Sequence, residues 1–222
     1  MIVVIGALGL RGTVDEPVPD GLAPEIASAA AAVGARVELI SKAGDDPAGD
    51  AVLLALARAG VGHVATLRDP ARLTPVRTAP AEPTDPADSS VDETADPAGD
   101  EAEVTSAEAA LSSSANPTLD AADVALALRY LTDFEVLVSV HPTAELLAEA
   151  VSAAGWTGAR LVVVVESDTE VPKGVPADAL VVSATTNDAE GVGARIGRYA
   201  AALSRGDDAA AAYRDLTETS SA

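Results

Sequence analysis

The sequence predicts an α/β protein with a three-layer, doubly wound and mostly parallel sheet. Short β-branched and apolar runs alternate with Ala-rich helical segments along the chain. The runs IVVI, VELI and LVVVV are typical of strands buried on both faces, as parallel strands are. Gly34 and Gly60 each follow a helical segment and act as stop signals.

Each element follows from this alternation. The expected strands span residues 1–6, 36–41, 61–67, 134–140, 159–165 and 179–184. The expected helices span residues 24–33, 47–59, 118–131, 143–154, 188–204 and 207–216. Thr118 or Asp120 caps the third of these helices.

Composition changes at residue 79. Residues 79–117 are mostly Pro, Ser, Thr, Ala, Asp and Glu, and no Lys or Arg occurs between Arg77 and Arg129. Such a stretch buries too little apolar surface to offset its ordering entropy, so we expect a disordered acidic insertion with a short helix at 102–111. Residues 1–78 and 118–217 then form a single domain, and residues 218–222 form a loose tail.

The charge balance excludes some partners. The formal net charge of the 222 residues is -21, from 14 basic and 35 acidic side chains. A surface this acidic repels phosphate backbones, which excludes nucleic acid as a partner. An acidic composition of this kind is typical of proteins encoded by GC-rich genomes. It also suits a cytoplasm with high salt, where the repulsion between the protein's own charges is screened.

The same sequence gives no sign of a membrane, secretion or a metal. No apolar run reaches the roughly 18 residues that a membrane span needs. The start MIVVIGALGLRG lacks a basic region, so we expect no signal peptide and a cytoplasmic location. Cys is absent, and no His/Glu cluster has metal-ligand spacing.

A motif in residues 34–61 points to a family. It reads GARVELISKAGDDPAGDAVLLALARAGV: a strand, a turn of Gly44, Asp45 and Asp46, and a helix. This order of elements and these residues resemble the N-terminal part of the ribokinase-like (PfkB) sugar and nucleoside kinases. The resemblance covers residues 1–61 and 118–216 and implies a ribokinase-like fold. The acidic insertion replaces the family's β-stranded lid, so we expect no normal lid, with residues 74–78 as its remnant.

The resemblance also implies the substrate-binding positions. In that family, the first strand ends in a turn whose aspartate grips sugar hydroxyls, followed by paired glycines and an asparagine. Here Arg11 stands about where the aspartate would be, Asp20-Gly21 replaces the glycine pair, and Glu25 replaces the asparagine. A guanidinium only donates hydrogen bonds, so Arg11 suits an anionic ligand, or is a solvated turn residue. The expected substrate-binding residues are Arg11, Gly21 and Glu25 from this resemblance, and His141 because it follows the expected strand 134–140.

The family's second signature, GAGD at a helix start, is altered. Its amides stabilise the transferring phosphoryl group, and its aspartate takes the hydroxyl proton. Asp188 matches this aspartate, whereas Thr186 and Asn187 occupy the phosphate-binding positions. Their side chains crowd a phosphate approaching the amides, and Asn187 or Asp188 also suits a plain N-cap. We therefore expect a kinase-like protein with impaired or absent phosphoryl transfer, kept for small-molecule binding or regulation.

The second signature also aligns in another way. The stretch ADALVVSATTNDAE resembles the family's mid-domain segment as well, where a strand ends in an asparagine followed by acids. Under either alignment, strands and loops that build much of the family's nucleotide pocket are missing. ATP and Mg²⁺ are expected only if kinase activity survives. Monomer and homodimer both stay open.

Two other functions stay open. One is an active ATP-dependent kinase with Asp188 as base and Arg11 for an anionic substrate. The other is a Rossmann-like dinucleotide binder that uses Gly6, Gly9 and Gly12, which form GxxGxxG after the first strand. Residues 13–19, with two prolines, follow where such a binder needs a helix.

Polar residues follow two of the expected strands. Ser139, His141 and Thr143 lie at the end of strand 134–140, and Glu166 and Asp168 follow strand 159–165. Because ligands bind beyond the carboxyl ends of strands in open α/β sheets, we expect these residues to face a cleft.

Overall fold

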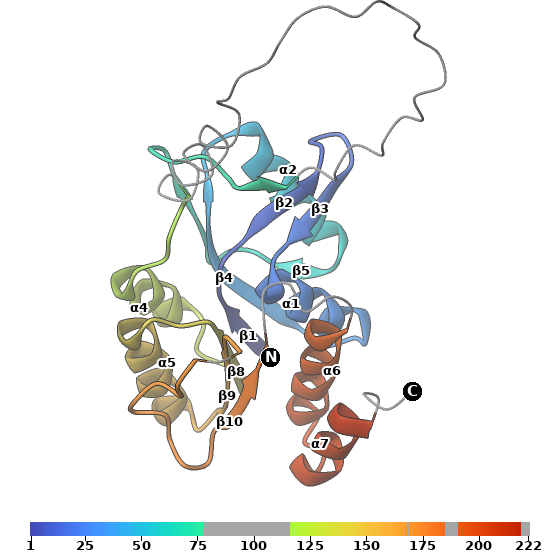
Figure 1. The fold of residues 1–222 in the computed structure, drawn as a ribbon, viewed down its shortest axis with the longest axis vertical. Coiled ribbons are helices and arrows are strands. Elements are labelled where there is room, and N and C mark those ends of the chain that lie inside the picture. The colour runs from blue at the N-terminus through green and yellow to red at the C-terminus, as the bar shows by residue number, and fades with distance from the viewer. Residues whose placement is uncertain (78–115, 168, 185–190, 219–222) are drawn as a thin grey trace, which may run out of the picture.

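The computed structural model describes residues 1–77, 116–167, 169–184 and 191–218 (Figure 1). Its strands are β1 Ile2–Ile5, β2 Gly9–Gly12, β3 Pro17–Asp20, β4 Val37–Gly44, β5 Val61–Gly62, β6 Thr66–Asp69, β7 Val76–Arg77, β8 Val136–Val140, β9 Arg160–Val165 and β10 Leu180–Ser183. Its helices are α1 Leu22–Ala32, α2 Pro47–Arg58, α4 Ala121–Tyr130, α5 Ala144–Thr157, α6 Val192–Ser204 and α7 Ala209–Glu218. The acidic insertion, except for residues 116 and 117, and the helix expected at 102–111 lie outside the described residues.

Seven parallel strands form the large sheet. Their order is β10-β9-β8-β1-β4-β5, and β6 also pairs with β4. The central strand β1 pairs with β4 on one side and with β8 on the other, so that Ile5 lies between Ile40 and Ser139. The predicted α/β class with a mostly parallel sheet is confirmed.

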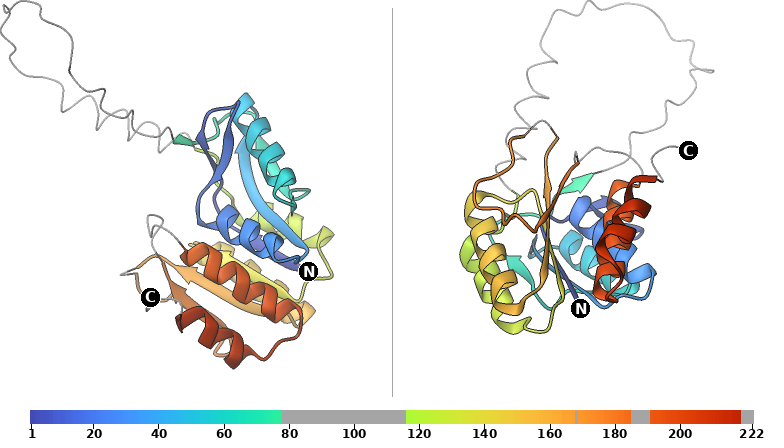
Figure 2. Two further views of the ribbon diagram at one scale, coloured as in Figure 1. Left: turned by 90° about the vertical axis from the view of Figure 1, so that its right-hand side faces the viewer. Right: turned by 90° about the horizontal axis from the view of Figure 1, so that it is seen from below.

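Helices cover both faces of this sheet (Figures 1 and 2). Successive side chains of a strand point to opposite faces. Ile2 and Val4 of β1 pack in the core with α1, α2, α6 and α7, whereas Val3 and Ile5 pack in the core with α4 and α5. The three layers expected from the sequence are therefore present, and all four of these β1 side chains are buried.

Aspartate side chains cap the starts of two helices. Asp46 caps α2, and Asp120 caps α4 in a capping box with Asp123. The expected end of α5 before Gly155 is wrong, because the helix continues to Thr157 and ends at Gly158 with φ 69°. Gly158 adopts the left-handed conformation that terminates helices, whereas Gly155 remains helical.

A small second sheet was not expected from the sequence. Its order is β3-β2-β7, with β2 and β3 antiparallel and β2 and β7 parallel. Pro17 and Pro19 suggested a loop, but they lie on the edge strand β3, where a missing N–H is tolerated. The expected lid remnant at 74–78 contains β7, and the expected strand at 61–67 divides into β5 and β6.

Among the described residues, no helix combines the length and the apolar character needed to cross a bilayer.

Candidate functional site

The strand order places a switch point between β1 and β8. From β1 the chain continues through α1 to β4, on one side of β1. From β8 it continues through α5 to β9, in the opposite direction, and α1 and α5 pack on opposite faces. Ligands of open α/β sheets bind outside the carboxyl ends of the strands at such a point. The topology therefore predicts a site beyond Ile5 and Val140.

A pocket of about 200 Å³ lies at this position. It is formed by the end of β1, the first turn of α1, the small sheet and the end of β8. The lining residues are Ala7, Leu8, Gly9, Asp20, Gly21, Leu22, Ala23, Pro75, Arg77, Val140 and His141. Two expected substrate-binding residues, Gly21 and His141, are thus brought together. Most of the lining is apolar, and Asp20, Arg77 and His141 are its charged or titratable members.

His141 has an unusual backbone. Its φ of 46° makes it the one non-glycine residue with positive φ among the residues that the structure describes. Its N–H donates to the Val164 carbonyl at 2.8 Å, and its Nε2 lies 3.0 Å from the Ala184 carbonyl oxygen. Because a carbonyl only accepts, Nε2 carries a proton. Nε2 also lies 3.5 Å from Oε2 of Glu166. Strain of about 1–3 kcal/mol at such residues is typical of functional sites.

Asp20 is a pocket residue that sequence reasoning missed. Its Oδ2 lies 3.3 Å from Nε of Arg77, so the ion pair joins the end of β3 to β7. The sequence indicated only that Asp20 replaces a family glycine. Its place in the pocket depends on the pairing of β2 with both β3 and β7, for which no local signal exists.

Arg11 and Glu25 do not line this pocket. Arg11 lies in the middle of β2 and is exposed, while its neighbour Leu10 is buried in the core. Arg11 therefore does not contribute to this pocket, and its expected role in ligand binding stays a prediction. Strand alternation directs Arg11 away from the core-facing side, which a turn at this place would not have done.

Glu25 lies instead at the start of α6. A Cβ atom added to Gly193 would be 2.5 Å from Cδ and 2.8 Å from Oε2 of Glu25. Gly193 is the second residue of α6, whose N-cap Gly191 makes no side-chain capping hydrogen bond. The Glu25 carboxyl group therefore fills the space against the first turn of this helix.

The helix start expected at Asp188 is wrong, since α6 begins at Val192. The expected catalytic residue Asp188 and the expected phosphate-binding residues Thr186 and Asn187 lie outside the described residues, as does Asp168.

The other polar residues expected at the cleft have different roles. Ser139 is buried, and its Oγ has no hydrogen-bond partner among the residues described. It shares a row with Ile5 and Val163, which pack on the α4–α5 face. Thr143 caps α5 by accepting a hydrogen bond from the Leu146 N–H. Neither residue lines the pocket.

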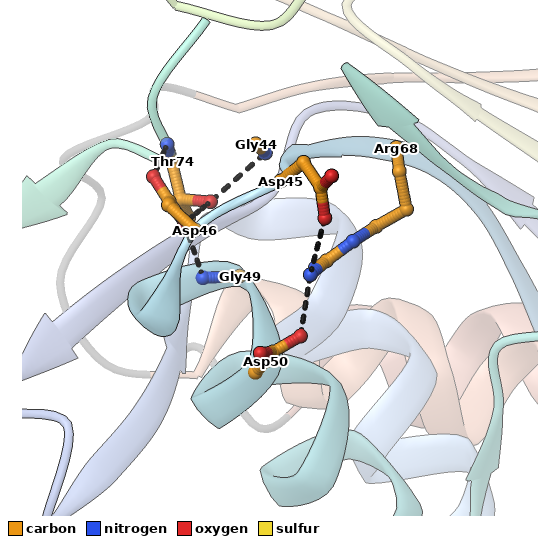
Figure 3. A network of polar contacts seen from close by, with 7 residues as sticks. All are labelled: Gly44, Asp45, Asp46, Gly49, Asp50, Arg68 and Thr74. Carbon is orange, nitrogen blue, oxygen red and sulfur yellow. Dashed lines mark hydrogen bonds and ion pairs between the residues drawn. The ribbon is translucent and has the colours of Figure 1, made fainter. Parts of the chain in front are cut away.

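The turn after β4 is a rigid structural network (Figure 3). The Asp46 carboxylate accepts hydrogen bonds from the N–H of Gly49 at 2.7 Å, the N–H of Thr74 at 2.7 Å and the Thr74 hydroxyl at 2.8 Å. Thr74 Oγ1 in turn accepts from the Gly44 N–H at 2.9 Å. Burial alone would raise the pKa of Asp46, but these hydrogen bonds outweigh it and lower the pKa below its usual value.

Asp45 differs from its neighbour. It lies 3.4 Å from Arg68, which also pairs with Asp50. Asp46 is therefore the residue that caps α2, whereas Asp45 forms part of an exposed ion-pair group. Since Thr74 precedes Pro75 of the pocket lining, the network also fixes one wall of the pocket.

The three spaced glycines do not form a dinucleotide-binding turn. Gly9 and Gly12 are the two ends of β2, and no helix follows until Leu22. A pyrophosphate turn needs a helix N-terminus directly after the glycines. The interpretation of Gly6, Gly9 and Gly12 as a Rossmann-like motif is therefore wrong.

No protein-family model matches this chain, and no curated protein matches it. Solved structures do match. The chain is similar to the protein Sa239, with a TM-score of 0.62, 15% identity, and coverage of 100% of this chain and 94% of that one. A putative ribokinase II from E. coli matches with a TM-score of 0.61, 14% identity, and coverage of 97% and 89%. A fructokinase from Xylella fastidiosa, solved with bound ATP, matches with a TM-score of 0.50, 15% identity and coverage of 97%, and the chain spans 64% of that fructokinase.

Proposed function

Because the chain has the ribokinase-like fold, we propose that it is a kinase-like protein that binds a small molecule in the switch-point pocket, with impaired or absent phosphoryl transfer. The pocket at the carboxyl ends of β1 and β8 carries this proposal. It lies at the switch point, where open α/β sheets usually bind their ligands. It also contains Gly21, which the resemblance names for substrate binding, and His141, which follows directly after β8.

The size of the pocket indicates the size of the ligand. Its volume of about 200 Å³ is below the ~300–1,000 Å³ usual for drug-sized ligands. A compact molecule therefore fits better than a nucleotide. The carboxylate of Asp20 accepts hydrogen bonds, the guanidinium of Arg77 donates them, and apolar side chains such as Leu8 and Leu22 pack against carbon. This set of groups suits a small hydroxylated molecule.

The start of α6 favours the loss of phosphoryl transfer. In the related kinases, amides at a late helix start stabilise the transferring phosphoryl group. Here the Glu25 carboxyl group lies against Gly193 in the first turn of α6. A carboxylate there repels a phosphate and already occupies the favourable end of the helix dipole. The described residues at this helix therefore do not fit a triphosphate. Losing one amide donor costs ~10²–10³ in rate at comparable sites.

Ligand binding tests the first half of the proposal. Thermal-shift and calorimetric titration would use a panel of monosaccharides, polyols and nucleosides. A ligand at ~100 times its Kd adds about 2.7 kcal/mol to the unfolding free energy, which raises Tm by roughly 5–10 °C in a protein of this size. We expect Asp20→Asn to abolish the shift. Asp15→Asn, an equal charge change in the exposed β2–β3 turn, should keep it. A panel without any binder, or equal binding by both variants, contradicts the proposed pocket.

Turnover tests the second half. We expect no ATP–Mg²⁺-dependent product above background with any sugar that binds. Glu25→Asn replaces the carboxylate by the family's residue and should increase ATP affinity, whereas Glu25→Asp should not. Product formation by the wild-type protein that disappears in Asp188→Asn would overturn the loss of transfer and leave an active kinase.

A further inference from the structure

A second concave surface lies far from the switch-point pocket, between α4 and α5. Its volume is about 340 Å³, and it shares no residue with that pocket. The lining residues are Ala125, Leu128, Arg129, Leu131, Thr132, Phe134, Glu149, Ser152, Ala153, Trp156 and Thr157. We call this surface the α4–α5 cleft.

The α4–α5 cleft gathers rare aromatic residues. The protein has 1 Trp and 1 Phe, and both line this cleft. Phe134 is buried at its base, whereas 85% of Trp156 is exposed. Tryptophan is among the residues most enriched at energetically important positions of protein interfaces. An exposed Trp beside a hollow in a chain this poor in aromatic residues therefore marks an interaction surface.

Two opposite charges flank the α4–α5 cleft. Arg129 lies on α4 and Glu149 on α5. Neither side chain forms a hydrogen bond or ion pair within the part of the chain that the structure describes. An occupant with one negative and one positive group would therefore complement both side chains.

We propose that the α4–α5 cleft is the interface of a two-fold homodimer. In such an interface the same surface meets itself, so a contact from one copy to the other occurs twice. Arg129 of each copy then faces Glu149 of the other, and both charges are satisfied without any further group. Trp156 of each copy packs into the hollow beside Leu128 and Phe134 of the other.

The chain itself offers no equal alternative. Residues 78–115 contain no Lys or Arg, so this stretch cannot neutralise Glu149. A polyanionic partner also cannot neutralise Glu149, and the net charge of -21 repels it. The same net charge makes two copies of the chain repel each other, but this repulsion acts between distant charges, which salt screens. Because the Debye length falls from ~10 Å at 0.1 M to ~3 Å at 1 M salt, added salt should strengthen the dimer.

The single Trp gives a direct readout of dimerisation. Sedimentation velocity and Trp emission would be recorded on the full chain over a concentration series, at low and high salt. We expect the mass to double and the emission to shift to shorter wavelength over the same concentration range, because Trp156 leaves water. Trp156→Ala should raise the dimer Kd by at least about 30-fold, as is usual for an interface hot spot. Val64→Ser, another highly exposed site, should leave it unchanged.

Charge exchange tests the pairing itself. Arg129→Glu and Glu149→Arg should each prevent self-association, because each variant sets like charges opposite one another. An equimolar mixture of the two variants should form the heterodimer, in which both pairs are attractive. Arg129 is exposed and Glu149 is half-buried, and neither belongs to the core, so circular dichroism should show that each variant is folded.

Three results would overturn the proposal. The first is a monomer at every concentration and salt. The second is a dimer that survives Trp156→Ala, which places the interface elsewhere. The third is a mixture of the two charge variants that remains monomeric.

Discussion

Replacing Asp46 by Ala should destabilise the protein more than replacing its neighbour Asp45. The substitution removes three hydrogen bonds to one carboxylate, two of which come from Thr74. Loss of the α2 cap costs about 1 kcal/mol. The buried N–H of Thr74 is left without an acceptor, which costs a further ~1–3 kcal/mol. We therefore expect a loss of about 3 kcal/mol in unfolding free energy and a fall in Tm of roughly 6–12 °C.

Urea unfolding followed by circular dichroism measures this loss. Asp45→Ala is the matched control, because Asp45 is adjacent, its side chain is 62% exposed, and that side chain pairs with Arg68 at 3.4 Å. Exposed pairs of this kind contribute ~0–1 kcal/mol. Asp46→Asn keeps one acceptor oxygen and should fall between the two. If Asp46→Ala loses no more than Asp45→Ala, the network in Figure 3 does not stabilise the fold as argued.

The same carboxylate predicts a pH dependence. The pKa of Asp46 is lowered in the folded protein, so its contribution is complete above the unfolded pKa of about 3.9 and is lost as the pH falls through the folded value. The difference in unfolding free energy between wild type and Asp46→Asn should therefore be full at neutral pH and shrink below about pH 4. A difference that stays constant or grows in acid contradicts this assignment.

Two further predictions concern other contacts. Lys42 pairs with Asp123 at 2.8 Å, and this hydrogen bond, opposed by desolvation, raises the pKa of Lys42. Lys42→Met should cost about 1–2 kcal/mol in urea unfolding, and the wild type should lose this contribution only as the pH rises through the raised pKa, above about 10.4. In α6, a Cβ at Gly197 would lie 2.5 Å from the Ile26 carbonyl oxygen, so Gly197→Ala should lower Tm and cost ~1–3 kcal/mol. Gly155→Ala in α5 meets nothing within 4 Å and should instead add ~0.5–1 kcal/mol, and equal effects of the two alanines would refute the close packing of α1 with α6.

The centre of the large sheet was predictable because β1, β8 and β9 are mostly apolar runs, and capped helices follow β4 and β8. The sequence indicated β1, β9 and α2 nearly to the residue, since their limits are set by local chemistry such as the Asp46 cap. The end of α5 was not predictable in the same way. Gly155 and Gly158 both offer a stop, and only the backbone angle chosen in the folded chain distinguishes them.

The candidate site was predictable in part. His141 was found because it directly follows a buried strand, and parallel strands end at the same edge of a sheet. Arg11 was misplaced because glycines at both ends of its segment suggested a turn, whereas the segment pairs with β3 and β7. Asp20 was missed because the ion pair with Arg77 joins residues far apart in the sequence. Such contacts depend on tertiary pairing, which local pattern does not specify.

The order of the large sheet divides the protein into two sequence halves (Figure 2). The strands from residues 1–77 lie on one side of the β1–β8 pair, and the strands from residues 116–184 lie on the other side. Two polypeptides produced from a gene cut within codons 78–115 would each present one bare strand edge, and joining them covers both edges at once. The protein is therefore suited to fragment complementation, in which reassembly restores both the β1–β8 junction and the packing of α6 on α1.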